Sequence, residues 1–146
     1  MAKMKLIYIC SPNQGNMFKE MIAMRQYCRR AYEKNCIPVA PHFYLLQFLD
    51  YNIPEEREFA LRIGLRLIDY CSAVWVHGDR ISYNMRAEIE HARATGKPII
   101  YVSFKKDGTE EYTTECNGLE AISHVDYEEI AALVDEGAIM ELREDI

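Results

Sequence analysis

The feature that most constrains the fold of this chain is a regular alternation of short apolar runs with longer segments of helical period. The apolar runs are rich in strand-forming residues and lie at 5–10, 36–41, 73–78 and 97–104. Strands that are apolar throughout are buried on both faces, which is typical of a parallel sheet covered by helices on either side. The alternation therefore predicts an α/β fold. We expect a doubly wound, flavodoxin- or Rossmann-like sheet of four to five parallel strands, with helices on both faces and right-handed crossovers.

Three helices are predicted between these strands. The second runs from Pro54, which suits a first helical turn, to about Tyr70, and the third spans 82–96 and stops at Gly96. The second is apolar on more than one face, so we expect it also to contact a partner subunit. The first helix begins at about Asn16, and its predicted buried face consists of Met17, Met21, Met24, Cys28 and Ala31.

The rest of the chain is less regular. Residues 43–54 form an aromatic-rich connection, 105–118 are predicted to be a loop or a hairpin, and 126–137 a helix with Asp126 as its N-cap. A length of 146 residues fits one domain, which we expect to span 1–146.

Composition restricts the function. The net charge of −6 and the pI near 5.2 argue against binding to a nucleic-acid backbone, which requires a concentrated positive surface. Five cysteines with no C-x-x-C spacing indicate neither a disulfide framework nor a zinc site, and no other metal-ligand spacing occurs. No apolar window approaches the length of a membrane span or a signal peptide. We expect a cytoplasmic protein that needs no cofactor.

A doubly wound sheet binds its ligand beyond the carboxyl ends of its strands, where the strand order switches. The loops that matter most are therefore "SPNQGN" at 11–16, "PHFY" at 41–44 and "HGDRIS" at 77–82. The first of these matches neither the dinucleotide-binding nor the P-loop glycine pattern. It can be a plain turn, or its amides and Asn16 can approach a phosphate or sugar.

Glu88 is the carboxylate most suited to chemistry. On a helical wheel, Met85, Ile89 and Ala92 form one buried stripe, Glu88 falls at its edge near the helix start, and Glu90 falls on the far side, in water. A partly desolvated carboxylate at the ligand crevice is a usable nucleophile or base. The alternative is a helix-edge glutamate paired with an arginine, either Arg86 or Arg93.

Other polar residues have two interpretations each. Ser82 can be an N-cap or can offer its hydroxyl to a ligand, and His42 and His77 are loop histidines unless they act in catalysis. Met85 and Trp75 suit the core.

At this point several motifs resemble the nucleoside 2-deoxyribosyltransferases. "IYICSP" resembles their first strand and loop, and residues 71–102 resemble their second half, with "SYNMRAEI" at the helix start. "APHFY" and "PEER" resemble motifs of a compact, largely uncharacterised bacterial and phage branch of that superfamily. The resemblance covers roughly residues 4 to 103.

The resemblance implies a mechanism. A glutamate at the position of Glu88 attacks C1′ of a deoxyribonucleoside and forms a glycosyl–enzyme ester, which a second base or water then resolves. It further implies that Tyr8 orients this glutamate, that Ser82 holds a 5′-phosphate where the substrate has one, and that the protein is an oligomer. From the resemblance and the position of the loops, we expect ten residues to bind the substrate. They are Ser11, Pro12, Asn13, Asn16, His42, His77, Gly78, Asp79, Ser82 and Met85.

The sequence departs from the family pattern in three places. Ser72 stands where the family usually has an aspartate, and Asn84 stands at the glycine of the helix-start turn. The transferases also hold and protonate the leaving base with an aspartate on the preceding helix, but the stretch "EFALRIGLRLI" at 58–68 has no acid after Glu58. Asp79, His77 or His42 could substitute for it.

Three hypotheses follow. The chain is an enzyme that cleaves or exchanges the N-glycosidic bond of a nucleoside or nucleoside 5′-monophosphate, with Glu88 and Tyr8 as its catalytic residues. Alternatively, it is a non-catalytic nucleotide-binding module of the same fold, or an interaction protein that assembles through residues 42–51 and 55–70.

Overall fold

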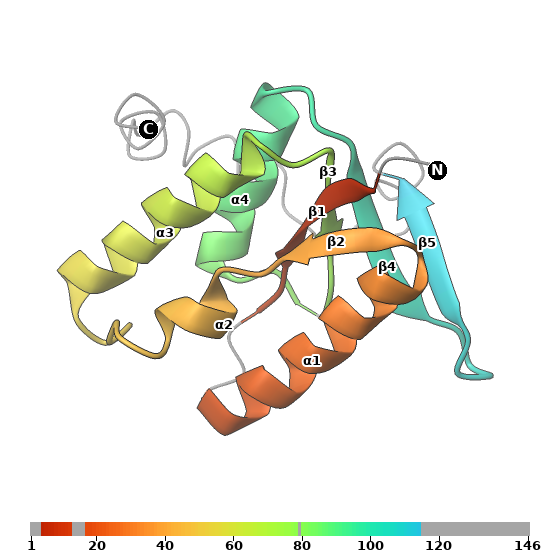
Figure 1. Cartoon of the computed structure of the whole chain (residues 1–146), viewed down its shortest axis with the longest axis horizontal. Helices are drawn as coiled ribbons and strands as arrows, with labels where there is room; N and C mark the ends of the chain where they lie inside the picture. The colour runs from red at the N-terminus through yellow and green to blue at the C-terminus, as the bar shows by residue number, and fades with distance from the viewer. Residues whose placement is uncertain (1–3, 13–16, 79, 115–146) are drawn as a thin grey trace.

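The computed structural model describes residues 4–12, 17–78 and 80–114, and it contains one mixed sheet (Figure 1). The strand order is β2-β1-β3-β4-β5, and the first four of these strands are mutually parallel. This order confirms the predicted doubly wound α/β fold, because β1 and β3 adjoin at the switch point of the sheet. The strands are β1 (Lys5–Cys10), β2 (Cys36–Val39), β3 (Ala73–Val76), β4 (Ile99–Phe104) and β5 (Glu110–Thr114).

Four helices connect the strands. They are α1 (Met17–Glu33), α2 (His42–Leu45), α3 (Pro54–Ile68) and α4 (Tyr83–Ala94). α3 and α4 agree with the predicted helices to within about two residues at each end, and α1 begins within one residue of its predicted start, a margin normal for helix termini. α2, a single helical turn at the start of the aromatic-rich connection, was not predicted from the sequence. The predicted helix at 126–137, with its N-cap Asp126, lies outside the described residues.

The helices cover both faces of the sheet (Figure 1). On one face, Tyr8, Val74 and Val76 pack with buried residues of α3 and α4. On the other face, Ile9 and Trp75 pack against α1. Successive side chains of β1 and β3 therefore enter two separate cores, which explains why these strands are apolar throughout.

The two edges of the sheet differ. β4 continues through a turn at Gly108, which has a φ of 87°, into β5, and β5 pairs antiparallel with β4. The segment after β4 is thus the hairpin that the sequence left open as one of two possibilities. At the opposite edge, β2 contains Pro38, which is opposite Ile7 of β1. Within the described part of the chain, no helix is long and apolar enough to cross a membrane.

Candidate functional site

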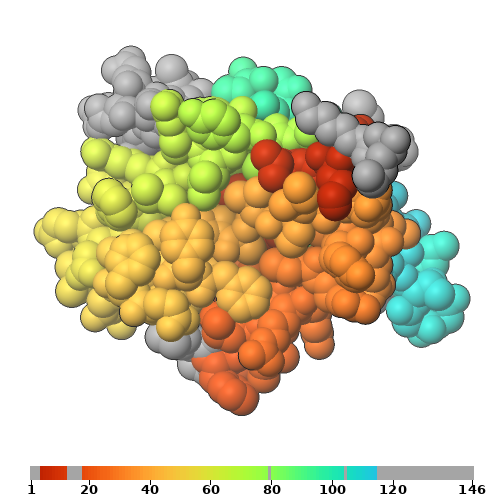
Figure 2. Space-filling model, in the orientation of Figure 1, coloured from red at the N-terminus to blue at the C-terminus, as the bar shows by residue number. Residues whose placement is uncertain are grey.

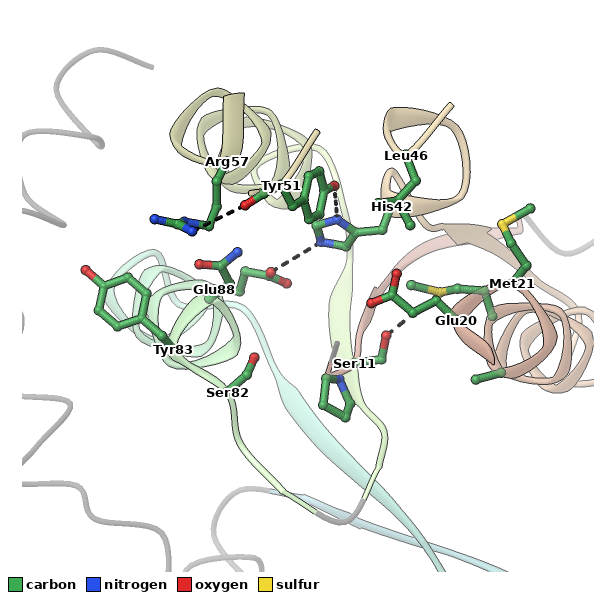
Figure 3. Close-up of a pocket in the computed structure, with 14 residues that line it drawn as sticks. Ser11, Glu20, Met21, His42, Leu46, Tyr51, Arg57, Ser82, Tyr83 and Glu88 are labelled. Atoms are coloured by element: carbon green, nitrogen blue, oxygen red, sulfur yellow. Dashed lines mark hydrogen bonds and ion pairs between the residues drawn. The ribbon is translucent and has the colours of Figure 1, made fainter. Parts of the chain in front are cut away.

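A cavity of about 530 Å³ lies beyond the carboxyl ends of the parallel strands, between α1 and α4 (Figure 3). This is the position at which doubly wound sheets bind ligands. No cluster of three or more His, Cys, Asp or Glu side chains that could hold a metal ion occurs in the described ranges. The cavity is lined by Ser11, Pro12, Glu20, Met21, Ala23, Met24, His42, Leu46, Tyr51, Arg57, Ser82, Tyr83, Asn84 and Glu88.

Glu88 is the most deeply buried charged group of this cavity. It lies in the second turn of α4, and only 2% of its surface is exposed. Its Oε1 lies 3.6 Å from Nε2 of His42, whereas its Oε2 has no hydrogen-bond partner among the described residues. A buried carboxylate oxygen without a partner is costly, so it is a group that a ligand would be expected to satisfy.

His42 is fixed from its other side by Tyr51. Nδ1 of His42 lies 2.6 Å from the Tyr51 hydroxyl, and the two rings meet edge to face. Burial and then the negative charges of Glu20 and Glu88 raise the pKa of Tyr51, so its phenol keeps its proton. The phenol can then donate to Nδ1, which leaves the ring hydrogen on Nε2, on the side of Glu88.

Tyr51 is itself held in place by α3. Arg57 Nη1 donates to the Tyr51 carbonyl oxygen over 3.2 Å. The His42 imidazole is therefore positioned by a chain of contacts that begins on α3 and passes through the connection between α2 and α3 (Figure 3).

Two side chains of β1 lie against Glu88. Tyr8 and Cys10 are fully buried, and burial followed by the negative charge of Glu88 raises the pKa of each. Both groups therefore stay neutral beside the carboxylate. The Tyr8 hydroxyl also lies close to the backbone of α3, because a Cβ added at Gly64 would lie only 2.6 Å from Tyr8 Oη.

The position of Ser82 is compatible with both of its predicted roles, the N-cap of a helix and a contact for a ligand. Its hydroxyl accepts a hydrogen bond from the Met85 backbone N–H over 3.4 Å, which makes it the N-cap of α4, and it also lines the cavity. Across the cavity, the Ser11 hydroxyl contacts the Met24 sulfur at 3.8 Å.

The structure brings five of the residues predicted to form the site together in the cavity, namely Ser11, Pro12, His42, Ser82 and Glu88. Tyr8 and Met85 lie in the core beside them. Gly78 supports the wall from behind, since a Cβ at this position would lie 2.6 Å from Pro12. Asn13, Asn16 and Asp79 lie outside the described residues.

His77 does not line the cavity. It continues the alternation of β3 and stacks on Tyr27 of α1, with ring centroids 4.2 Å apart, and it is 1% exposed. Burial, and then the positive charge of Arg30, lowers its pKa to about 3. The side-chain period of the strand therefore turns His77 toward α1, away from Glu88.

The expected solvent exposure of Glu90 was wrong. Its side chain is 17% exposed, and its Oε2 accepts from Arg93 Nη1 over 2.8 Å. α4 is buried over more than one stripe because α3 packs on it as well as the sheet. Arg93, one of the two predicted partners of Glu88, is thus paired with Glu90.

Sequence reasoning did not assign Glu20, Tyr51 and Arg57 to the site. Tyr51 precedes the helix that starts at Pro54, and Arg57 is the last residue of its "PEER" motif. The motif supported the resemblance to the family, but it did not indicate that these two side chains line the cavity. Glu20 had no local signal, because it lies one turn into a helix whose pattern predicts only a buried face.

One protein family matches the part of the chain that contains this cavity. A family described only as a domain of unknown function (DUF7768) matches residues 5–102. The chain belongs to the DUF7768 family. All the residues that line the cavity lie within the part that matches, so the cavity is a feature of the DUF7768 domain.

Among solved structures, the DUF7768 chain is similar to a 2-deoxyribosyltransferase from the psychrotolerant bacterium Bacillus psychrosaccharolyticus. The identity is 20% and the TM-score is 0.49, over 66% of this chain and 70% of the other. No functionally curated protein matches the chain.

Proposed function

We propose that this DUF7768 domain cleaves or exchanges the N-glycosidic bond of a nucleoside or nucleoside 5′-monophosphate, with Glu88 as the nucleophile. The observation that carries the proposal is the buried Glu88 carboxylate on the wall of a cavity of about 530 Å³, with one oxygen unpartnered among the described residues. Cavities of this size hold small organic ligands. The sequence motifs that resemble the nucleoside 2-deoxyribosyltransferases support the same assignment.

In the proposed reaction, a Glu88 oxygen attacks C1′ of the sugar. The C1′–N bond breaks through a transition state with oxocarbenium character, and its electron pair leaves with the base. The resulting glycosyl ester on Glu88 is resolved when water or a second base attacks C1′ and releases the carboxylate. Water gives hydrolysis, and a second base gives transfer.

The surroundings of Glu88 suit this role. A carboxylate that is removed from water is a stronger nucleophile, because no hydration shell has to be displaced before it attacks. Tyr8 and Cys10 beside it are neutral, so neither adds a charge next to the carboxylate. His42, held by Tyr51, limits where the Glu88 carboxylate can point. Preorganisation of this kind is what a nucleophile needs in order to meet C1′ in line.

Ser82 and the N-terminus of α4 are the proposed contact for the sugar or its 5′-phosphate. The Ser82 hydroxyl lies on the cavity at the start of a 12-residue helix, where the helix dipole favours negative charge. Arg57 also lines the cavity and would add to the attraction of a phosphate.

The test is chromatographic detection of free base. Purified protein is incubated with ribo- and deoxyribonucleosides and with their 5′-monophosphates, with and without an acceptor base. We expect base release that Glu88→Gln lowers by at least about 10³-fold, because the nucleophile is lost. Dependence on the acceptor base separates transfer from hydrolysis.

Glu90→Gln is the matched control. It makes the same chemical change two residues further along α4, at a side chain paired with Arg93, and we expect near-normal activity. Base release by Glu88→Gln at the wild-type rate would contradict the proposal. No release from any substrate, together with calorimetric binding of a nucleotide, would instead assign a non-catalytic binding module.

We also propose that the chain forms homo-oligomers. α2, α3 and the segment between them carry exposed aromatic side chains, including Phe48 at 62% and Phe59 at 48% exposure. The side chains of α1, 36–53 and α3 adjoin one another across one face of the molecule (Figure 2). Exposed apolar surface of this kind favours association. A monomeric species at all concentrations in analytical ultracentrifugation would contradict this.

A further inference from the structure

An N-glycosidic bond breaks readily only if the departing base receives a proton, and the α3 helix supplies no carboxylate for this task. The proton donor must lie across the sugar from Glu88, because the bond that breaks points away from the attacking oxygen. α1 forms the wall of the cavity opposite α4, and Glu20 on α1 points its carboxylate toward that of Glu88 (Figure 3).

The other titratable groups of the cavity are less suitable donors. His42 lies on the side of the nucleophile, with Nε2 near Glu88 and Nδ1 at Tyr51. Tyr51 holds its proton too tightly, since its pKa is raised. His77 is outside the cavity and, with a pKa lowered to about 3, carries no proton to give near neutral pH.

We infer that Glu20 is the acid–base catalyst on the base side of the cavity, and that it protonates the leaving nucleobase while Glu88 attacks C1′. The inference rests on the proposed function, and it assigns the role that the sequence left without a residue. Two carboxyl groups with opposed tasks, on opposite sides of a glycosidic bond, are the arrangement that glycosidases use.

Tyr51 provides independent support for this arrangement. The negative charges of both Glu20 and Glu88 act on its hydroxyl, and the contribution of Glu20 is the larger. The two carboxylates therefore share one site around Tyr51, although 68 positions separate them in the chain. The unpartnered Oε2 of the buried Glu88 indicates that a ligand belongs between them.

The atoms balance as follows. A Glu88 oxygen forms a bond to C1′ as the C1′–N bond breaks, and the electron pair of the C1′–N bond goes to the base nitrogen. The carboxylic acid of Glu20 gives its proton to the base, which leaves neutral. Water then attacks C1′, Glu20 takes the proton of that water, and the Glu88–C1′ bond breaks to regenerate both carboxyl groups. Overall, a nucleoside and water give the free sugar and the free base.

Leaving-group dependence tests the inference. A natural nucleoside needs a proton donor, whereas p-nitrophenyl β-D-ribofuranoside or its 2-deoxy analogue releases a stable p-nitrophenolate without one. We expect Glu20→Gln to lower kcat for base release by about 10²–10⁴-fold. We expect the same variant to release p-nitrophenolate within about tenfold of the wild-type rate, while Glu88→Gln abolishes both reactions.

Glu33→Gln is the matched control, because Glu33 lies on the same helix and pairs with Arg29 at the exposed surface. It should leave both rates unchanged. Thermal unfolding of each variant shows whether the fold is retained, and Glu20→Ala gives a second variant with the same expected pattern.

The outcomes separate the two proposals. If Glu20→Gln slows both substrates equally, or neither, while Glu88→Gln abolishes both reactions, the inference on Glu20 is wrong and the proposed function stands. If Glu88→Gln remains active, or the wild type releases neither base nor p-nitrophenolate, the proposed function fails and the inference fails with it.

Discussion

Nε2 of His42 lies 3.6 Å from Oε1 of Glu88, although the two residues come from different helices, α2 and α4. The histidine is the one basic side chain of the described residues that forms an ion-pair contact with this carboxylate, whereas its neighbours on β1, Tyr8 and Cys10, are neutral. Because the Tyr51 hydroxyl holds the opposite edge of the ring, the position of the Glu88 carboxylate depends on Tyr51 through His42.

Tyr51→Phe is therefore expected to slow base release while leaving the fold intact. The variant keeps the ring that packs edge to face with His42 but removes the hydroxyl 2.6 Å from Nδ1. Misplacement of a nucleophile lowers kcat more than it raises KM, and we expect a loss of about 10- to 100-fold in kcat. Steady-state kinetics on the best substrate measures it, and Tyr44→Phe, which alters an exposed tyrosine, serves as control. Equal kinetics for the two variants would rule out this role of Tyr51.

Glu88→Gln is expected to make the protein more stable. The wild-type carboxylate is buried, and one of its oxygens has no partner among the described residues. Removing a buried charge typically gains about 1 kcal/mol, or about 2–4 °C in the melting temperature of a chain of this size. Differential scanning fluorimetry measures the shift. Glu90→Gln should instead be neutral or slightly destabilising, because Glu90 is paired with Arg93. A lower melting temperature for Glu88→Gln would contradict the expectation.

The contact between Gly64 and Tyr8 predicts a non-additive pair of variants. A Cβ at Gly64 would lie 2.6 Å from the Tyr8 hydroxyl oxygen and 3.7 Å from Cζ, so the clash involves the hydroxyl alone. We expect Gly64→Ala to cost about 1–3 kcal/mol of the free energy of unfolding.

In a Tyr8→Phe background, the same change should be neutral or stabilising by up to about 1 kcal/mol, because alanine favours the helix and the clash is gone. Urea unfolding of the four proteins of this cycle gives the coupling. If the effects of the two substitutions on the free energy of unfolding are additive, the Tyr8 hydroxyl is not the reason why a side chain at position 64 is destabilising.

His77 predicts a loss of stability at acidic pH. Its folded pKa is lowered to about 3, whereas an unfolded histidine titrates near 6.5, so between these values the unfolded chain binds a proton that the folded chain does not. The free energy of unfolding therefore falls as the pH falls below about 6.5, by about 1.4 kcal/mol per pH unit.

Between pH 7.5 and 5.0 this single group accounts for about 2 kcal/mol. Urea unfolding at the two pH values should show a smaller decrease, by about this amount, for His77→Phe, which keeps a ring against Tyr27. An identical decrease in the wild type and in the variant would mean that His77 is protonated in the folded protein.

The fold could be predicted from the sequence because its signals are local. The apolar runs at 5–10 and 73–78 contain the strands β1 and β3, and their parallel pairing follows from the helices between them. The direction of β5 could not be predicted, since residues 110–114 read "EEYTT" and carry no apolar run. α2 was missed because a single helical turn has too few positions to show a period.

Those residues of the site that follow a strand or lie near the start of a helix could be predicted from the sequence. Ser11, His42 and Ser82 follow strands, and the wheel placed Glu88 toward the crevice. Glu20 and Tyr51 reach the cavity only through the packing of α1 and of the connection after α2, and no local pattern records that packing. The sequence also did not reveal that His77 faces the opposite side of the sheet from Tyr8, because the exact phase of a four-residue strand decides it.

Pro38 in β2 has a consequence for the behaviour of the protein at high concentration. β2 is an edge of the sheet among the described strands, and an open edge can recruit a strand from another molecule and seed aggregation. Proline has no N–H to offer such a strand, and it is tolerated in a sheet where its nitrogen faces outward from the edge. Pro38 thus opposes the addition of a further strand at the β2 edge, which favours a protein that resists aggregation during expression and storage.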